Sequence, residues 1–186
     1  MNDPSHALVV YESMFGSTRL VADAVTSGLR LGGLDASLVA VGSAPAELRA
    51  GVDLLVVGGP THAFSLSRPA TRANAVTQGA SPDDAVIGLR EWLTALRLQG
   101  SRPPAVAAFD TRVTKVRWLP KAAGPAALRL ARKLGMRTMA RAEGFLVDDV
   151  RGPLVDGELE RAVGWGRGLA ETWAAKQAAE AVSRRA

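Results

Sequence analysis

The 186-residue chain has no cysteine. This absence excludes disulfides, thiol catalysis, iron–sulfur clusters and thiolate metal sites, so any redox activity needs a bound cofactor. Histidine is scarce as well, because only His6 and His62 occur and they fall on different predicted elements. Such an arrangement cannot supply a two-histidine metal pair on one helix. We therefore predict no metal site and no catalytic triad.

Long apolar runs are missing too. No stretch approaches the roughly 20 residues that a membrane-spanning helix requires, and residues 1–6 lack the basic region of a secretory signal. The two common nucleotide loops, Gly-x-x-x-x-Gly-Lys-Ser/Thr and Gly-x-Gly-x-x-Gly, are also absent, so nothing points directly to a nucleoside triphosphate or a dinucleotide. We expect a cytoplasmic protein with no membrane span.

A hydrophobic content of 47% with 22% charged residues is typical of a globular protein. We expect residues 1–186 to form one domain whose last residues, 176–186, fray. Apolar runs predict five strands, at residues 7–11, 36–41, 52–57, 104–109 and 144–147. The intervening segments predict helices at residues 17–31, 84–100, 124–135 and from 156 onward, with a short helical turn at 45–48. Strands that alternate with helices indicate an α/β fold with a doubly wound parallel sheet.

The first strand leads into a short loop rich in small and hydroxyl-bearing residues. Ser13, Gly16, Ser17 and Thr18 place hydroxyls and backbone N–H groups at the start of the helix over residues 17–31. Unpaired N–H donors and the positive end of the helix dipole favour a phosphate at such a position. The alternative is an ordinary strand-to-helix turn in which Ser17 or Thr18 caps the helix.

Two further stretches follow buried strands. Residues 58–64, Gly-Gly-Pro-Thr-His-Ala-Phe, leave the third strand, and Asp110, Thr111 and Arg112 leave the fourth. Ligands collect at the carboxyl ends of the strands in an open α/β sheet, so we expect both stretches beside the phosphate loop. The alternative for residues 58–64 is a Gly-Pro turn with Phe64 tucked into the core.

Residues 65–83 are polar and rich in turn-forming residues, and we predict a long loop there that acts as a lid or is simply mobile. Two arginines in this loop, Arg68 and Arg72, could bind a substrate carboxylate or the phosphate of a nicotinamide cofactor, or could be solvated.

Charge is distributed unevenly along the chain. The net charge is +5, and residues 112–141 contain nine basic side chains and no acidic one. This asymmetry indicates a positive surface for an anionic ligand or an acidic partner, unless the stretch only solvates a helix face.

The motifs resemble those of the flavodoxin family. Its first signature is matched in order by Val9, Val10, Tyr11, Ser13, Gly16, Thr18, Ala22 and Val25, and its second loop by Gly58, Pro60 and Thr61. The Ser-Met-Phe-Gly loop is more similar to flavodoxin-like quinone reductases than to the small electron carriers. This resemblance implies a five-stranded sheet in the order 2-1-3-4-5, with FMN as the cofactor.

The resemblance also implies a set of FMN-binding residues. The phosphate would be bound by the first loop, comprising Ser13, Met14, Phe15, Gly16, Ser17 and Thr18. The edges of the flavin ring would meet the second loop, comprising Pro60, Thr61, His62, Ala63 and Phe64. The pyrimidine end would meet Asp110, Thr111 and Arg112. The family often places an aromatic side chain over the outer ring face, whereas here that face is open to a flat substrate or is covered by Trp118 or by a partner subunit.

Three functions follow from these interpretations. The leading one is an FMN protein in electron transfer or flavin-dependent oxidoreduction, with a redox partner protein or a small-molecule electron acceptor. The second is an enzyme acting on a quinone or a porphyrinogen, with His62 as a possible proton donor. The third is a flavin-free interaction module that uses its basic stretch; nucleic acid is not an expected partner.

Overall fold

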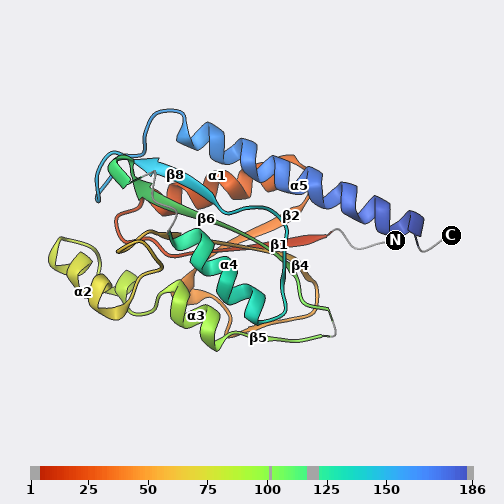
Figure 1. Ribbon diagram of the computed structural model, residues 1–186, viewed down its shortest axis with the longest axis horizontal. Helices are drawn as coiled ribbons and strands as arrows, with labels where there is room; N and C mark the ends of the chain where they lie inside the picture. The colour runs from red at the N-terminus through yellow and green to blue at the C-terminus, as the bar shows by residue number, and fades with distance from the viewer. Residues whose placement is uncertain (1–4, 101, 117–121, 184–186) are drawn as a thin grey trace.

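A parallel sheet forms the middle layer of the protein (Figure 1). The computed structural model describes residues 5–100, 102–116 and 122–183. Strand order is β2-β1-β4-β6, followed by β7 and β8, which pair with successive parts of β6. The strands are β1 (His6–Tyr11), β2 (Asp35–Ala40), β4 (Val52–Pro60), β6 (Ala105–Val113), β7 (Arg137–Thr138) and β8 (Glu143–Val147). β7 and β8 lie one after the other along the same strand, β6, and together take the place of the fifth predicted strand. The predicted α/β fold and the strand order 2-1-3-4-5 are therefore confirmed.

Helices cover both faces of this sheet (Figure 1). One face carries α1 (Ser17–Leu31) and α5 (Glu158–Ser183), and the other carries α3 (Leu89–Ala95) and α4 (Ala123–Lys133). Side chains alternate along each strand, so Val9 and Val56 join the core under α1 and α5, whereas Val10 and Val57 join the core under α3 and α4. The central strands are therefore buried on both sides, as their continuous apolar runs predicted.

Several short elements connect the main ones. They are the 3₁₀ turns η1 (Val41–Ser43), η2 (Asp83–Ala85) and η3 (Thr114–Val116) and the strands β3 (Glu47–Leu48) and β5 (Arg97–Leu98). The prediction of a helical turn at residues 45–48 was wrong, because β3 pairs in parallel with β5. The indole N–H of Trp92 donates to the carbonyl of Pro45 at 2.9 Å and attaches this segment to α3.

The prediction of a long loop at residues 65–83 was also wrong, because the segment contains α2 (Pro69–Thr77). Proline suits the first turn of a helix, and the hydroxyl of Thr71 accepts a hydrogen bond from the N–H of Arg68. Arg72 is buried and donates to the carbonyl of Ala85 and to the side chains of Ser67 and Glu91. It is consequently not available to a substrate anion.

The last helix, α5, extends to Ser183. Across the described residues, no helix combines the length and the apolar character that a bilayer crossing needs.

Candidate functional site

The three predicted loops meet where β1, β4 and β6 end, at what we call the carboxyl edge of the sheet. A cavity of about 70 Å³ lies between them. Its lining includes nine of the predicted residues: Met14, Phe15, Ser17, Thr18, Pro60, Thr61, His62, Thr111 and Arg112. Ala63 and Phe64 follow directly in the turn beside it. The fold brings these nine residues to one cavity, whereas Ser13 and Gly16 line a separate cavity with Glu12, Asp83 and Asp84.

The loop between β1 and α1 is shaped to accept an anion. Gly16 has φ of 93°, a left-handed conformation, and a Cβ atom there would have nothing within 4 Å. The hydroxyl of Ser13 accepts hydrogen bonds from the N–H groups of Gly16 (3.1 Å) and Arg19 (3.3 Å). No acceptor in the described part of the chain engages four other amide N–H groups of the loop, those of Met14, Phe15, Ser17 and Thr18. These donors and the open space at Gly16 meet the requirements of a phosphate cradle.

The expected alternative, a helix capped by Ser17 or Thr18, was wrong. The N-cap residue is Gly16, which has no side chain to cap the helix. The buried hydroxyl of Thr18 instead lies 2.8 Å from that of Thr111, which joins the loop to β6. Next to it, the N–H of Thr61 donates to the carbonyl of Thr111 at 2.9 Å, and the Thr61 hydroxyl accepts from the N–H of Ala123 at 3.0 Å. All three loops are thus tied together by hydrogen bonds.

A strained turn lies beside the cavity. His62 and Ser65 exchange backbone hydrogen bonds of 2.9 and 3.0 Å, and the two residues between them have positive φ angles, 46° for Ala63 and 62° for Phe64. Neither is glycine, so the turn carries backbone strain of the kind that collects at functional sites. The Phe64 side chain is 47% exposed, so the alternative that it packs in the core was wrong.

His62 lines the cavity as a neutral ring. Burial lowers the pKa of its imidazole, and the nearby positive charge of Arg72 lowers that pKa further. The lowered pKa favours the neutral ring, in which one nitrogen donates a hydrogen bond and the other accepts one.

The third predicted segment divides between the cavity and the core. β6 continues through Val113, so the side chains of Asp110 and Arg112 share one face while that of Thr111 takes the other. The carboxylate of Asp110 is fully buried and accepts from the N–H of Gly124 at 3.0 Å and from Arg112 at 2.6 and 2.7 Å. Thr111 and Arg112 reach the cavity, whereas Asp110 anchors the start of α4. The expected outer-face candidate Trp118 lies outside the described residues.

Sequence reasoning missed the contribution of β8 and the segment after it. Val147 and Val150 line the same cavity, together with Val113. Residues 144–147 were predicted as a strand, so their position at the carboxyl edge was a usable signal. Val150 carried no such signal, because only the path of the chain after β8 brings it back.

Glu12 was also missed, although it directly precedes the phosphate loop. Its side chain is 1% exposed, Oε2 accepts from the N–H of Leu89 at 2.8 Å, and Oε1 has no partner within the described part of the chain. Burial raises the pKa of this carboxyl, and interactions with the Ser67 side chain, the N–H of Leu89 and the charge of Arg72 offset that effect only in part. Among the described residues, no group of three potential ligands could hold a metal ion.

No family model and no curated protein matches the chain. Solved structures do. A flavodoxin from the domain Archaea is similar with a TM-score of 0.60 and 20% identity, over 89% of this chain and 96% of that one. Flavodoxin 2 from Bacillus cereus gives a TM-score of 0.63 and 16% identity, over 89% of this chain and 98% of that one. The rubredoxin oxygen:oxidoreductase of Desulfovibrio gigas gives 0.59 and 16%, over 94% of this chain but only 38% of that protein. These likenesses confirm the fold that the sequence motifs implied: the chain has a flavodoxin-like fold.

Proposed function

We propose that the chain binds FMN at the carboxyl edge and works in electron transfer or in flavin-dependent oxidoreduction. One observation carries the proposal, namely the four N–H groups of the loop, at Met14, Phe15, Ser17 and Thr18, that no acceptor in the described part of the chain engages. Preorganised backbone donors at a helix N-terminus are what a doubly charged phosphate needs. Proteins named as flavodoxins are among the solved structures with this fold, which supports FMN as the phosphate-bearing group.

The residues fit the phosphate end of FMN better than they enclose the whole molecule. A cavity of about 70 Å³ is far smaller than the roughly 300–1,000 Å³ of typical small-molecule sites. The flavin ring is therefore larger than the cavity and would contact rim residues, of which Phe64 offers an exposed aromatic face. FMN supplies the electron-transfer chemistry when it is bound.

Residues of the chain itself would position the bound FMN. Ser13 holds the loop open through its two accepted hydrogen bonds, and the Thr18–Thr111 pair fixes the loop relative to β6. Arg112 brings a positive charge to the rim, but its ion pair with the buried Asp110 balances most of that charge. Val147 and Val150 give the cavity an apolar lining on the side of β8.

A second candidate is a quinone reductase, and the orientation of polar groups favours it over a porphyrinogen enzyme. His62 faces the cavity and can offer a neutral N–H to a quinone oxygen. A porphyrinogen presents carboxylates, which Arg68 and Arg72 were expected to bind. Arg72 is buried and donates its hydrogen bonds to Ser67 and Glu91, so it is not available to a carboxylate ligand. Turnover with NAD(P)H and a quinone would separate this enzyme from a simple carrier.

The test compares two glycine substitutions that impose the same backbone strain. Gly16→Asp fills the open cradle and adds a negative charge, so FMN affinity should fall by about tenfold or more. Gly33→Asp is the matched control, because Gly33 has φ of 90° and open space around it but lies beyond the far end of α1. FMN binding is measured by quenching of flavin fluorescence.

Equal FMN affinity in the two variants would remove the phosphate loop from the proposal. Absence of FMN binding by the wild-type chain would favour the flavin-free interaction module instead.

A further inference from the structure

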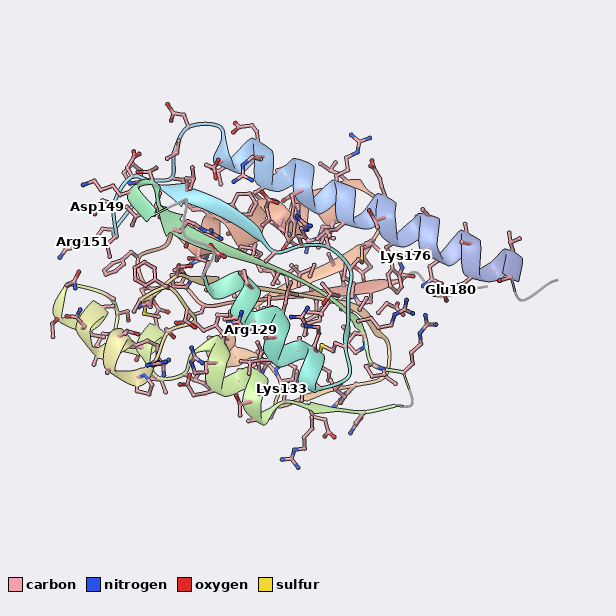
Figure 2. The ribbon with its side chains drawn as sticks, viewed as in Figure 1. Arg129, Lys133, Asp149, Arg151, Lys176 and Glu180 are labelled. Atoms are coloured by element: carbon pink, nitrogen blue, oxygen red, sulfur yellow. The ribbon has the colours of Figure 1, made fainter. Side chains whose placement is uncertain are left out.

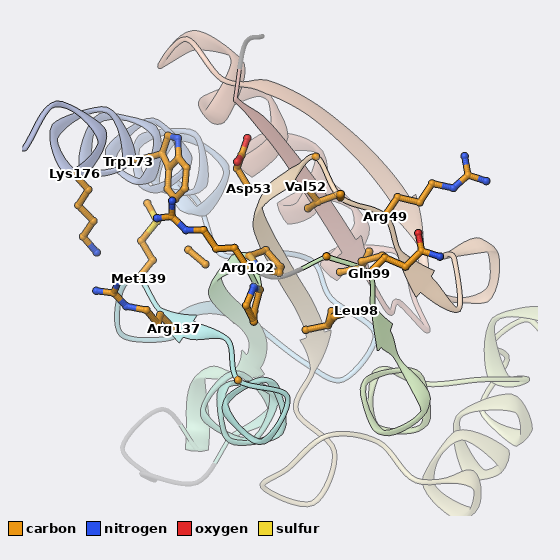
Figure 3. Close-up of a pocket in the computed structure, with 18 of the residues that line it drawn as sticks. Arg49, Val52, Asp53, Leu98, Gln99, Arg102, Arg137, Met139, Trp173 and Lys176 are labelled. Carbon is orange, nitrogen blue, oxygen red and sulfur yellow. The ribbon is translucent and has the colours of Figure 1, made fainter. Parts of the chain in front are cut away.

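A larger cavity lies where the strands begin, at what we call the amino edge of the sheet. Its volume is about 350 Å³, within the range of small-molecule sites. The wall comes from the turn before β4, the segment between β5 and β6, β7 with the residue after it, and α5 (Figure 3). β4 runs from this edge to the carboxyl edge over Val52–Pro60, about 26 Å at the rise of an extended strand. The amino-edge cavity is thus separate from the candidate FMN site.

Part of the lining is apolar. Leu48 in β3, Met139 directly after β7 and Trp173 in α5 are all more than nine-tenths buried and line the cavity. An apolar wall of this kind favours a ligand with a flat or aliphatic body over a small inorganic ion, since burying that body removes apolar area from water.

Two buried polar atoms in the same wall have no hydrogen-bond partner within the described part of the chain. They are the hydroxyl oxygen of Thr138 and the indole nitrogen of Trp173. Buried polar groups are almost always paired. Both atoms lie beneath the surface of the wall, so they add polar character to the lining without being open to a ligand themselves.

The rim carries an excess of positive charge. Arg102 is paired with Glu180 at 3.0 Å, and the carboxylate of Asp53 accepts from the backbone of His6 at 3.0 Å. Arg49, Arg137 and Lys176 also line the cavity and make no ion pair within the residues that the structure describes.

Three of the cations gather on one side of the cavity. In Figure 3 the ends of Arg102, Arg137 and Lys176 lie on the side of Met139 and Trp173, whereas Arg49 points away. Several cations beside an apolar wall match an anion attached to an apolar body.

We propose that the amino-edge cavity binds an aromatic carboxylate. Its ring lies against Leu48, Met139 and Trp173, and its carboxylate meets Arg137 and Lys176. The site does not depend on FMN, and it places a second ligand at the far end of the strands from the candidate redox centre.

The experiment uses 2-naphthoate as the probe and isothermal titration calorimetry of the full chain as the measurement. The test variant Arg137→Glu/Lys176→Glu reverses two exposed charges at the cavity. Its matched control, Arg129→Glu/Lys133→Glu, makes the same two changes on the exposed side of α4, outside the cavity (Figure 2). Wild type and control should bind 2-naphthoate alike, and the test variant about tenfold more weakly or worse. The uncharged analogue 2-naphthamide should also bind more weakly to the wild type.

Three results would overturn the proposal. The first is no binding of 2-naphthoate by the wild type at millimolar concentration. The second is equal weakening in both double variants, which would mean attraction to the overall positive charge. The third is displacement of 2-naphthoate by saturating FMN, which would place the probe at the carboxyl edge. If the wild type binds no FMN at all, the proposed function fails, while the comparison of the two double variants still decides this inference.

Discussion

At the scale of single residues, Glu12 is the buried carboxyl nearest to the phosphate loop. Its pKa is raised above 4.5 in the folded protein, so the folded state holds the proton more tightly than the unfolded chain does. The resulting stabilisation is fully present below pH 4.5 and is lost as the pH rises through the raised folded-state pKa.

Glu12→Gln removes this titration while keeping an acceptor for the N–H of Leu89. The variant should therefore gain about 1–3 kcal/mol of unfolding free energy over wild type on the alkaline side and nothing at the acidic end. Chemical denaturation of the flavin-free protein across the pH range measures the difference. The same change at the exposed Glu47 is the control, and a constant offset between variant and wild type at every pH would contradict the account.

Two substitutions in the turn at Ala63 and Phe64 distinguish the effect of backbone strain on stability from a contribution of the Phe64 ring to FMN binding. Phe64→Gly relieves a positive φ angle and should stabilise the flavin-free protein by about 1 kcal/mol, yet it should weaken FMN binding because the exposed ring is lost. Phe64→Ala keeps the strain, so it should weaken FMN binding without the gain in stability. Thermal unfolding and FMN titration of both variants provide the comparison. The hypothesis of a flavin-contacting Phe64 fails if both bind FMN as tightly as the wild type.

At the scale of elements, the contact between α1 and α5 depends on glycine. A Cβ atom on Gly28 would lie 2.1 Å from the carbonyl oxygen of Val163, a backbone atom of α5 that cannot swing aside. Gly28→Ala should therefore cost about 1–3 kcal/mol of stability. In contrast, Gly168→Ala places its methyl in open space within α5 and should stabilise the protein by about 0.5–1 kcal/mol. Urea denaturation of the two variants tests this, and equal effects would contradict the packing described here.

The elements also show what the sequence could and could not reveal. The helix over Ser17–Leu31 was predicted to the residue, because a clear apolar stripe is closed by two glycines. α2 was missed, since Pro69–Thr77 offers mostly small and polar side chains and no apolar stripe. Asp110 and Arg112 were predicted as loop residues because charged side chains are uncommon inside a buried strand. Their ion pair with each other allows them to lie in β6, and the sequence alone does not reveal this pairing. The positive φ angles at Ala63 and Phe64 had no signal either, as neither residue type marks such a turn.

At the scale of the whole molecule, the basic side chains that the structure describes within residues 112–141 do not form one patch. Arg112 lies at the carboxyl edge and Arg137 at the amino edge, whereas Arg129 and Lys133 lie along α4 (Figure 2). The net charge of +5 still favours added negative charge on a bound ligand.

This charge leads us to predict a less negative midpoint potential for bound FMN than in an acidic flavodoxin, by an amount that shrinks as salt is added. Potentiometric titration at two ionic strengths measures it. A very low potential that does not respond to salt would contradict the prediction.

The central claim is that the loop between β1 and α1 binds a phosphate group. The most direct measurement is the ratio of the affinities of the flavin-free protein for FMN and for riboflavin, which differ only in that phosphate. Because four amide donors await the phosphate, we predict that FMN binds about 100-fold more tightly than riboflavin or better, and that inorganic phosphate competes with it. Equal affinities for the two flavins would contradict the claim.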